Sequence, residues 1–426
     1  MIKKSFIGLA KPHLEYERLE DTPKIEKIPN PEKVTFLIDA LYNKKKALLK
    51  KGAAVKTGQK LAVYENKYDY FTSSVAGKVS SLSSYPGNFG KSYTAIEVEV
   101  ADGETDDQFS QVANKPSIDN ISDFLAFSPG NPSIKSFSNS EKPINSIVVC
   151  GVDQDLLITT NQYVVKSNIE AVKKGIEILK AVTRVDNIIL VVSEAQAQSV
   201  SSSGTGIKIK QVDSKYPAAL PQLIAKNLLG KVIPAGKTCE DMGICFISAE
   251  AVASIGDAFE KGHIPTTKIL TLIKKDGSKV LVSAKIGTPV GNIFETLNIT
   301  VNEKDKIIFG GPMTGSAVYS LDHPVQPDTD AIIVQDKEDI PVFSNYPCIN
   351  CGECVRICPA NIQINLLVRF LETGQYQEAA DQYDLYSCIE CGLCSYVCVS
   401  GMPIFQYIRS AKYELGRANT AEATNG

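Results

Sequence analysis

The feature that most constrains this chain is a cysteine pattern that occurs twice near its C-terminus. The first copy has the spacing Cys-x2-Cys-x2-Cys-x3-Cys and is followed by Pro359, and the second copy repeats that spacing. The eight cysteines are Cys348, Cys351, Cys354, Cys358, Cys388, Cys391, Cys394 and Cys398. A chain that places four thiols so close together folds that segment as a tight loop around whatever the thiols bind. Without a signal peptide, clustered thiols indicate metal ligands or redox groups rather than disulfides.

This spacing is typical of proteins that bind two [4Fe-4S] clusters. In such proteins the fourth cysteine of each run binds the cluster of the other run. We therefore predict two ligand sets that cross between the runs. The first set is Cys348, Cys351, Cys354 and Cys398, and the second set is Cys388, Cys391, Cys394 and Cys358. Gly352 and Gly392 follow the second cysteine of each run, where they are expected to let backbone N–H groups approach the cluster sulfurs and tune the potential.

Zinc is the alternative to iron–sulfur clusters. Structural zinc sites use separated Cys-x2-Cys pairs, which two runs of four cysteines fit poorly. The three histidines, His13, His263 and His323, lie far apart and share no ligand spacing. We therefore expect no histidine-built metal site, and electron transfer through clusters needs no catalytic acid or base of the chain itself.

Composition places this chain among ordinary globular proteins. It has 426 residues, of which 22% are charged, and a net charge of −3. Because neutralising phosphates requires a basic excess, we expect no nucleic-acid partner. No apolar run approaches the roughly 18 residues that span a bilayer. The protein is therefore expected to be soluble or peripheral, without a transmembrane span of its own.

The N-terminal part predicts an arm and a β module. Residues 1–35 contain several prolines without periodicity and are expected to form an extended arm. Residues 36–105 contain short apolar runs separated by turn glycines, including a strand predicted at 47–49, and this module resembles the barrel-sandwich hybrid of lipoyl domains. Lys67 lies nearest the position of a modified carrier lysine, but its neighbours do not match, so a purely structural module is the prediction.

The central part predicts two further modules. Residues 106–265 read as an α/β domain, in which strands at 147–150 and 188–192 flank a helix at about 164–182. Residues 266–335 favour a β-grasp-like (SLBB-like) module that opens with a hairpin. Gly310–Gly315 is glycine-rich but does not lie between a strand and a helix as a dinucleotide-binding loop does, so we interpret it as a turn.

The C-terminal part, residues 336–415, predicts a helical domain around the two cysteine runs. Apolar residues at helical spacing over 403–415 predict a helix after the second run. The polar tail, 416–426, is expected to be frayed. The chain is thus predicted to be a multidomain protein of α/β and α+β class that ends in an α-helical ferredoxin domain for two [4Fe-4S] clusters.

Several collinear motifs make the chain resemble the C subunit of the Rnf complex, an ion-translocating ferredoxin:NAD oxidoreductase. They are Gly175–Leu179, Lys215-Tyr216-Pro217, Pro234–Gly243, Gly287–Val290, Gly310–Met313, Cys388–Gly392 and Pro403–Arg409. The resemblance implies a peripheral subunit on the cytoplasmic face of the cell membrane. It implies membrane subunits and a ferredoxin-like B subunit as partners, with ferredoxin as a further one. It also implies a central domain like the flavin-bearing subunit of respiratory complex I.

The same comparison exposes departures where that family would bind FMN and NAD. The stretch Phe124–Pro132 replaces a glycine-rich loop and keeps only Gly130. Asp153 and Asp155 stand where the family has longer acids, and Ala218-Ala219 replaces a pair of glycines. Because side chains and prolines obstruct such a loop, Gly130, Asp153 and Asp155 are interpreted as remnants of a flavin site that is lost or altered.

We interpret the chain as an iron–sulfur subunit that relays single electrons through two clusters. A flavin-containing subunit that reacts with NADH is the first alternative, and a structural scaffold whose clusters do not titrate is the second. The N-terminal modules argue against a third, the iron–sulfur subunit of a soluble quinone- or heterodisulfide-type reductase.

A few remaining residues have simpler interpretations. Cys150 and Cys245 are expected to be core thiols, whereas Cys239 lies in a polar turn and is a candidate reactive thiol. Lys44–Lys46 and Lys50-Lys51 are interpreted as a solvated face, or as a surface that steers an acidic partner such as ferredoxin.

Overall fold

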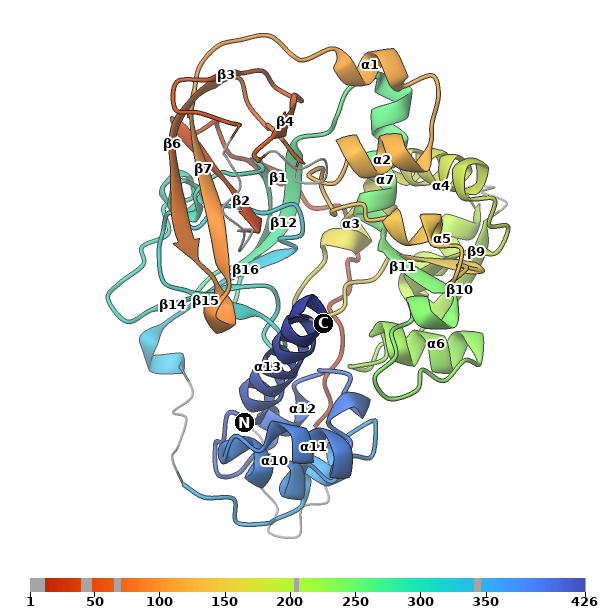
Figure 1. Cartoon of the computed structure of the whole chain (residues 1–426), viewed down its shortest axis with the longest axis vertical. Helices are drawn as coiled ribbons and strands as arrows, with labels where there is room; N and C mark the ends of the chain where they lie inside the picture. The colour runs from red at the N-terminus through yellow and green to blue at the C-terminus, as the bar shows by residue number, and fades with distance from the viewer. Residues whose placement is uncertain (1–11, 40–47, 65–69, 203–206, 341–345, 426) are drawn as a thin grey trace.

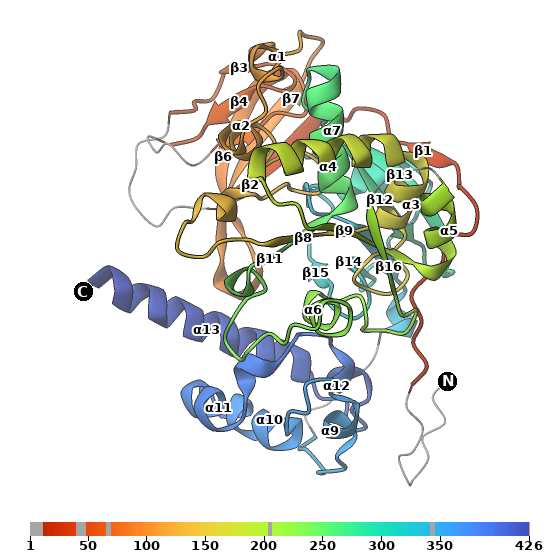
Figure 2. The same cartoon turned by 90° about the vertical axis from the view of Figure 1, so that its right-hand side faces the viewer.

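The computed structural model describes residues 12–39, 48–64, 70–202, 207–340 and 346–425. Two antiparallel β-sheets, one parallel sheet flanked by helices, one mixed sheet and a helical C-terminal domain account for them. Figures 1 and 2 show the helical domain at the lower end, below the sheets. Both views place α6 (Pro221–Leu229) nearest to that domain among the helices around the parallel sheet.

The N-terminal β module is a small antiparallel sheet with the order β2-β7-β6-β3. Its strands are β2 (Lys33–Asp39), β7 (Ser92–Val100), β6 (Gly77–Pro86) and β3 (Ala54–Val55), and a separate pair is formed by β4 (Lys60–Ala62) and β5 (Tyr70–Thr72). The strand predicted at 47–49 is wrong over its described residues, Leu48 and Leu49, whose amides only reach the carbonyl of Val63. Lys67 and Lys44–Lys46 lie outside the described residues.

The parallel sheet has the order β10-β9-β8-β11. Its strands are β10 (Lys208–Val212), β9 (Ile188–Ser193), β8 (Ser146–Cys150) and β11 (Ile244–Ser248). Alternate residues of β8 and β9 face opposite sides, as expected for pleated strands. One face packs on α2 (Ile118–Phe124), α4 (Ile169–Thr183) and α7 (Ala249–Lys261), and the other face packs on α6.

The helix predicted over 164–182 is two helices. The first is α3 (Thr160–Ser167), and α4 begins after Asn168, whose backbone leaves the helical region with φ −133° and ψ 35°. Asparagine competes for backbone hydrogen bonds with its own side chain, which explains a break that the apolar periodicity does not reveal. After this break α4 packs closely on α7, because Gly175 and Gly256 stand at the contact and a Cβ on either would meet backbone at 2.0 Å.

The mixed sheet has the order β1-β13-β12-β16-β14-β15. Its strands are β1 (Ile25–Lys27), β13 (Lys279–Lys285), β12 (Thr267–Ile273), β16 (Ala331–Gln335), β14 (Lys306–Phe309) and β15 (Ser316–Val318). The predicted hairpin is confirmed as the antiparallel pair β12 and β13, and one short helix, α8 (Val290–Thr296), follows it. Strand β1 comes from the N-terminal arm and pairs in parallel with β13.

The C-terminal domain is built from short helices around an apolar core. They are α9 (Glu353–Ile357), α10 (Ile364–Glu372), α11 (Tyr376–Gln382), α12 (Leu393–Tyr396) and α13 (Ile404–Asn425). The polar segment predicted as a frayed tail is helical, because α13 continues to Asn425. The segment after Gly416 contains alanine, arginine and glutamate and neither glycine nor proline before Gly426, which favours a continuing helix.

Two short α-helices and several 3-10 turns complete the described elements. They are α1 (Gln108–Val112), α5 (Glu194–Ser202) and the turns at Asn88–Gly90, Lys135–Ser138, Glu240–Met242, Lys337–Asp339 and Leu385–Ser387. In the described part of the chain, no helix is both long and apolar enough to cross a bilayer.

Candidate iron–sulfur centre

The first cysteine run folds into a loop that is closed by the last cysteine of the second run. The thiols of Cys348, Cys351, Cys354 and Cys398 line one small cavity of about 20 Å³. The turn depends on Gly352, which has φ +76° and begins α9. The backbone N–H of Met402 donates to Cys398 Sγ at 3.4 Å. The structure thus brings together the four residues of the first predicted ligand set.

The second run has the same local geometry. Gly392 has φ +71° and begins α12, and the backbone N–H of Glu390 donates to Cys388 Sγ at 3.4 Å. Burial raises the pKa of Cys391 to about 12, and the nearby thiols of Cys388 and Cys358 contribute to this increase. Cys358, from the end of the first run, therefore lies beside the second run.

The protonation of these thiols follows from their burial. Burial, followed by the neighbouring thiols of Cys351, Cys348 and Cys398, raises the pKa of Cys354 to about 12. Burial also raises the pKa of Cys394 well above its ordinary value. These thiols are therefore protonated at neutral pH until a metal centre binds, and binding must release their protons.

The donor set suits a multinuclear centre more than one ion. Within the described residues, no three His, Cys, Asp or Glu side chains converge closely enough to hold a single metal ion. In a four-iron cluster each thiolate binds a different iron, so its sulfurs surround a volume and do not converge on one point. Four thiols around a small cavity fit that requirement.

The two runs differ in their exposure. Cys351 in the first run is exposed, and its neighbour Ile349 keeps 65% of its surface accessible. Cys391, the equivalent cysteine of the second run, is only 7% exposed. Its carbonyl accepts a hydrogen bond of 2.7 Å from the hydroxyl of Tyr216. The first run therefore faces solvent, whereas the second packs against the rest of the protein.

The loop Gly310–Gly315 forms much of that packing. A Cβ added to Gly392 would lie 2.5 Å from the carbonyl oxygen of Met313, so the second run and this loop touch backbone to backbone. On its other side the loop is held by the Asp155 carboxylate, which accepts hydrogen bonds from the backbone N–H groups of Met313 (3.2 Å) and Thr314 (2.8 Å) and from the Thr314 hydroxyl (2.6 Å). Sequence reasoning treated this loop as a plain turn and did not detect that it connects Asp155 to the cysteine domain.

The acids predicted as flavin-site remnants are both buried and hydrogen-bonded. Asp155 is 4% exposed, and burial raises its pKa although its donors act in the opposite direction. Asp153 is 3% exposed and accepts from the backbone N–H of Asn161 at 2.8 Å, and burial raises its pKa to about 6. Both carboxylates therefore serve the protein's own backbone.

The third predicted remnant, Gly130, is packed against the start of α7. It has φ +80°, and a Cβ there would lie 2.3 Å from the backbone nitrogen of Ala251. Its own N–H donates to the carbonyl of Pro327 at 2.8 Å, and the preceding carbonyl of Pro129 accepts from the Ser254 hydroxyl at 2.8 Å. The loop around Gly130 thus lies directly on the helix terminus.

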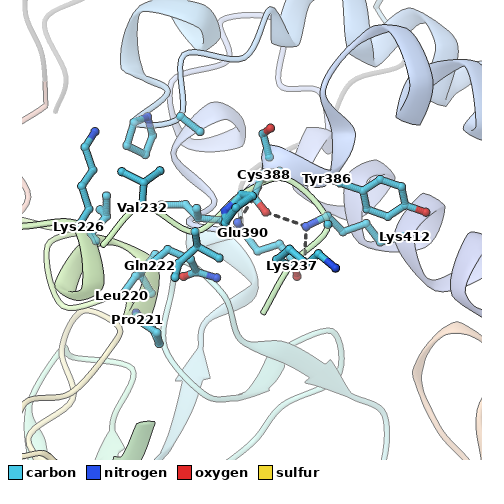
Figure 3. A pocket seen from close by; sticks show the side chains of 18 of the residues that line it. Leu220, Pro221, Gln222, Lys226, Val232, Lys237, Tyr386, Cys388, Glu390 and Lys412 are labelled. Carbon is cyan, nitrogen blue, oxygen red and sulfur yellow. Dashed lines mark hydrogen bonds and ion pairs between the residues drawn. The ribbon is translucent and has the colours of Figure 1, made fainter. Parts of the chain in front are cut away.

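Two cavities lie near these residues. One of about 170 Å³ lies beside Asp153 and is lined in part by Tyr16–Arg18 of the N-terminal arm. This volume is below the roughly 300–1,000 Å³ of typical small-molecule sites. A much larger cavity, of about 750 Å³, lies between α6 with its following loop and the second cysteine run, and Figure 3 shows it from close by.

The structure also places the remaining cysteines and a histidine that the sequence analysis singled out. Cys150 and Cys245 are buried, as predicted for core thiols. Cys239 is half-buried, and burial raises its pKa to about 11, which disfavours the reactive thiolate. His323 shares one hydrogen bond of 2.8 Å, through its Nδ1, with the Tyr85 hydroxyl.

Two family models match separate parts of the chain. Residues 347–402 match the 4Fe-4S dicluster domain, a segment that contains all eight cysteines of the two runs. Residues 134–264 match the NqrA second alpha/beta domain, a segment that contains the parallel sheet. The chain therefore contains a 4Fe-4S dicluster domain after a mixed α/β part.

Curated relatives match over much longer stretches. The C subunit of the proton-translocating ferredoxin:NAD(+) oxidoreductase complex of Clostridium ljungdahlii is 28% identical, with 98% of this chain and 96% of the relative covered. The C subunit of the ion-translocating oxidoreductase complex of Pectobacterium carotovorum is 27% identical, with 67% of this chain covered. The chain spans only 39% of that relative's length. The corresponding C subunit of Buchnera aphidicola is also 27% identical, with 60% of this chain and 55% of the relative covered.

Among solved structures, the similarity is lower. An NAD+-reducing [NiFe]-hydrogenase in the H2-reduced state aligns with a TM-score of 0.43 and 11% identity, over 72% of this chain and 60% of the hydrogenase chain. That score is too low to support any argument about this protein. The sequence relatives, by contrast, include one that matches along almost the whole chain. The protein is a homologue of the C subunits of the ion-translocating oxidoreductase complexes.

Proposed function

We propose that this protein relays single electrons through two [4Fe-4S] clusters as the C subunit of an Rnf-type ion-translocating ferredoxin oxidoreductase. The observation that supports this most strongly is the grouping of the cysteines. Cys398 of the second run lies among the thiols of the first run, and Cys358 of the first run lies beside Cys388 and Cys391. The proposed ligands are Cys348, Cys351, Cys354 and Cys398 for the first cluster, and Cys388, Cys391, Cys394 and Cys358 for the second.

Bound clusters would supply one-electron redox chemistry. The chain's own residues would tune the reduction potentials of the clusters and control how closely a partner can approach them. The N–H groups of Glu390 and Met402 point at sulfur atoms and stabilise added negative charge, which raises a cluster's potential. The crossing cysteines hold the two clusters close together. The exposed Cys351 lets a protein partner approach the first cluster, while the second is enclosed.

We propose in addition that the expected FMN and NAD site is lost or altered. Asp153 and Asp155 are saturated by internal donors, and the loop around Gly130 is filled by its contact with α7. A phosphate needs free backbone N–H groups, and this loop offers few because Pro129 and Pro132 have none. These residues therefore do not fit a flavin phosphate.

The assembly we propose follows the relatives. The partners are a ferredoxin-like B subunit, the membrane subunits and ferredoxin, with this chain peripheral on the cytoplasmic face of the membrane. We also propose a division of the chain into six units. They are the arm (1–35), the barrel-sandwich-like module (36–105), the flavoprotein-like α/β domain (106–265), the β-grasp-like module (266–335), the cluster domain (336–415) and the tail (416–426). The pairing of β12 with both β13 and β16 supports the β-grasp assignment.

The experiment that tests the relay is cluster analysis of single-cysteine variants, purified without oxygen. Iron and acid-labile sulfide are measured, and the dithionite-reduced protein is examined by electron paramagnetic resonance. Cys398→Ser is expected to change the same signal as Cys348→Ser, and Cys358→Ser the same signal as Cys388→Ser. Cys245→Ser, a buried cysteine outside the runs, serves as the control. Grouping of Cys398→Ser with Cys388→Ser would disprove the crossed ligation, and a protein with stoichiometric zinc would disprove the relay.

A further inference from the structure

A lysine from the last helix contacts the backbone of the second cysteine run. Lys412 lies on α13, and its ammonium group donates to the carbonyl of Cys388 at 2.7 Å and pairs with the Glu390 carboxylate at 2.9 Å. Figure 3 shows Lys412 and Glu390 pointing toward each other. Since Cys388 is a proposed ligand of the second cluster, a positive charge is fixed on a residue that would bind that cluster.

The first cysteine run has a similar cation, but water reaches it. Arg356 donates to the carbonyl of Cys351 at 3.0 Å and to the carboxylate of Glu353 at 2.6 Å. The Arg356 side chain is 51% exposed, whereas the Lys412 side chain is 20% exposed. Because water and salt screen exposed charges more than half-buried ones, Lys412 acts more strongly on its cysteine run than Arg356 does on the other.

Burial, and not hydrogen bonding to sulfur, distinguishes the surroundings of the two proposed clusters. Met402 donates to Cys398 Sγ beside the first, and Glu390 donates to Cys388 Sγ beside the second, both at 3.4 Å. The second run, however, is enclosed where the first is exposed. Reduction adds a negative charge, which an enclosed apolar environment disfavours. Burial alone would therefore give the second cluster the lower reduction potential.

The carboxylate of Glu390 does not cancel the charge of Lys412. Its side chain is 40% exposed, twice the exposed fraction of Lys412, so water screens the carboxylate more than the ammonium group. The ammonium group also bonds directly to the carbonyl of Cys388. The ion pair therefore presents its positive end to the ligand residue, where it opposes the effect of burial.

We infer that Lys412 is a positioning residue that, through Cys388, raises the reduction potential of the second cluster. Its positive charge stabilises the electron that burial disfavours, so the enclosed cluster stays reducible by the exposed one. One electron leaves the first cluster, which is oxidised, and reduces the second, and no bond or proton is involved. This inference rests on the proposed function, because it concerns one of the two proposed clusters.

The test is a redox titration of the full-length protein, purified without oxygen and monitored by electron paramagnetic resonance. Lys412→Met should lower the ratio of reduced to oxidised second cluster about tenfold at a fixed potential, which is a midpoint shift of about 59 mV for one electron. Lys412→Arg keeps the charge and should retain most of the wild-type midpoint. Arg356→Gln, which removes the exposed cation of the first run, should leave the second midpoint unchanged.

Glu390→Gln separates the effect of charge from that of structure. Lys412→Met and Glu390→Gln break the same ion pair, so a merely structural role would move the midpoint of the second cluster in the same direction in both variants. If the charge of Lys412 acts on the cluster, Glu390→Gln should instead raise that midpoint. It removes the negative partner and leaves the ammonium group in place.

The outcomes separate this inference from the proposed function. An unchanged midpoint in Lys412→Met, or shifts of the same sign in Lys412→Met and Glu390→Gln, would overturn the inference even when both clusters titrate. If Lys412→Met loses the iron of the second cluster, Glu390→Gln decides. A raised midpoint then supports the inference, and a lowered or unchanged one overturns it. A wild-type protein without two reducible clusters would instead count against the relay.

Discussion

The carboxylate of Asp155 accepts two hydrogen bonds from Thr314, one from its backbone N–H at 2.8 Å and one from its hydroxyl at 2.6 Å. Through this contact the segment that follows β8 holds the loop Gly310–Gly315, and that loop contacts the second cysteine run at Gly392. A residue that sequence comparison assigns to a flavin site therefore has a structural connection to the cluster domain.

The first prediction concerns Asp155. Asp155→Ala should destabilise the protein by about 2–3 kcal/mol, because it leaves the buried N–H groups of Met313 and Thr314 without an acceptor. Thr314→Val, which removes only the hydroxyl bond, should cost about 1 kcal/mol. Urea unfolding of the anaerobic protein measures both, and iron analysis should show loss from the Asp155 variant first. Equal stability of the two variants would contradict this account.

The second prediction compares the two glycines that follow the second cysteine of each run. Both have positive φ, but a Cβ on Gly392 would lie 2.5 Å from the Met313 carbonyl oxygen, whereas on Gly352 the nearest atom is the flexible guanidinium of Arg356 at 3.3 Å. Gly392→Ala should therefore lose iron from the second cluster, while Gly352→Ala should retain most iron in both. The measurement is iron and sulfide content together with the paramagnetic spectrum. Equal iron loss in both variants would contradict this expectation, because it would show that the strain of a positive φ, and not the contact with Met313, determines iron retention.

The third prediction concerns Tyr216, whose hydroxyl donates to the carbonyl of Cys391 at 2.7 Å. Tyr216→Phe should leave that carbonyl without this donor, cost about 1 kcal/mol, and change the paramagnetic line shape of the second cluster. Tyr16→Phe is the matched variant, since the Tyr16 hydroxyl accepts a hydrogen bond from the backbone N–H of Ala219 at 3.0 Å and not from a cysteine run. It should cost a similar free energy but leave the line shape unchanged.

The fourth prediction is a pH dependence that arises from His323. Burial lowers the pKa of His323 from its ordinary 6.5 to about 4. Between these values the unfolded chain binds a proton that the folded protein does not, so the free energy of unfolding should fall as the pH is lowered from 6.5 to 4. His323→Phe should flatten this decrease, and His263→Asn, which replaces an exposed histidine, is the control. Denaturant unfolding at several pH values gives the slopes, and an unaltered slope in His323→Phe would refute the assignment.

How well the sequence predicts this structure depends on how far apart along the chain the interacting residues lie. The dicluster domain, the buried strands at 147–150 and 188–192 and the hairpin of β12 and β13 rest on local patterns, and these predictions were confirmed. The break at Asn168 arises because an asparagine side chain competes for backbone hydrogen bonds. The continuation of α13 arises from helix-favouring residues after Gly416. The periodicity of apolar residues detects neither effect. The bond from Asp155 to Thr314 and the cavity between α6 and Lys412 join segments far apart in the chain, so no local pattern contained them.

The account's central claim is that electrons pass through two clusters without a flavin, and an anaerobic absorbance titration tests it most directly. The spectrum of the purified protein is recorded alone, after adding NADH, and then after adding dithionite. We predict that NADH leaves the broad iron–sulfur absorbance unchanged and that dithionite bleaches it. Bleaching by NADH with a flavin-shaped difference spectrum would contradict the claim and show that the altered loop at Gly130 still serves a working flavin site.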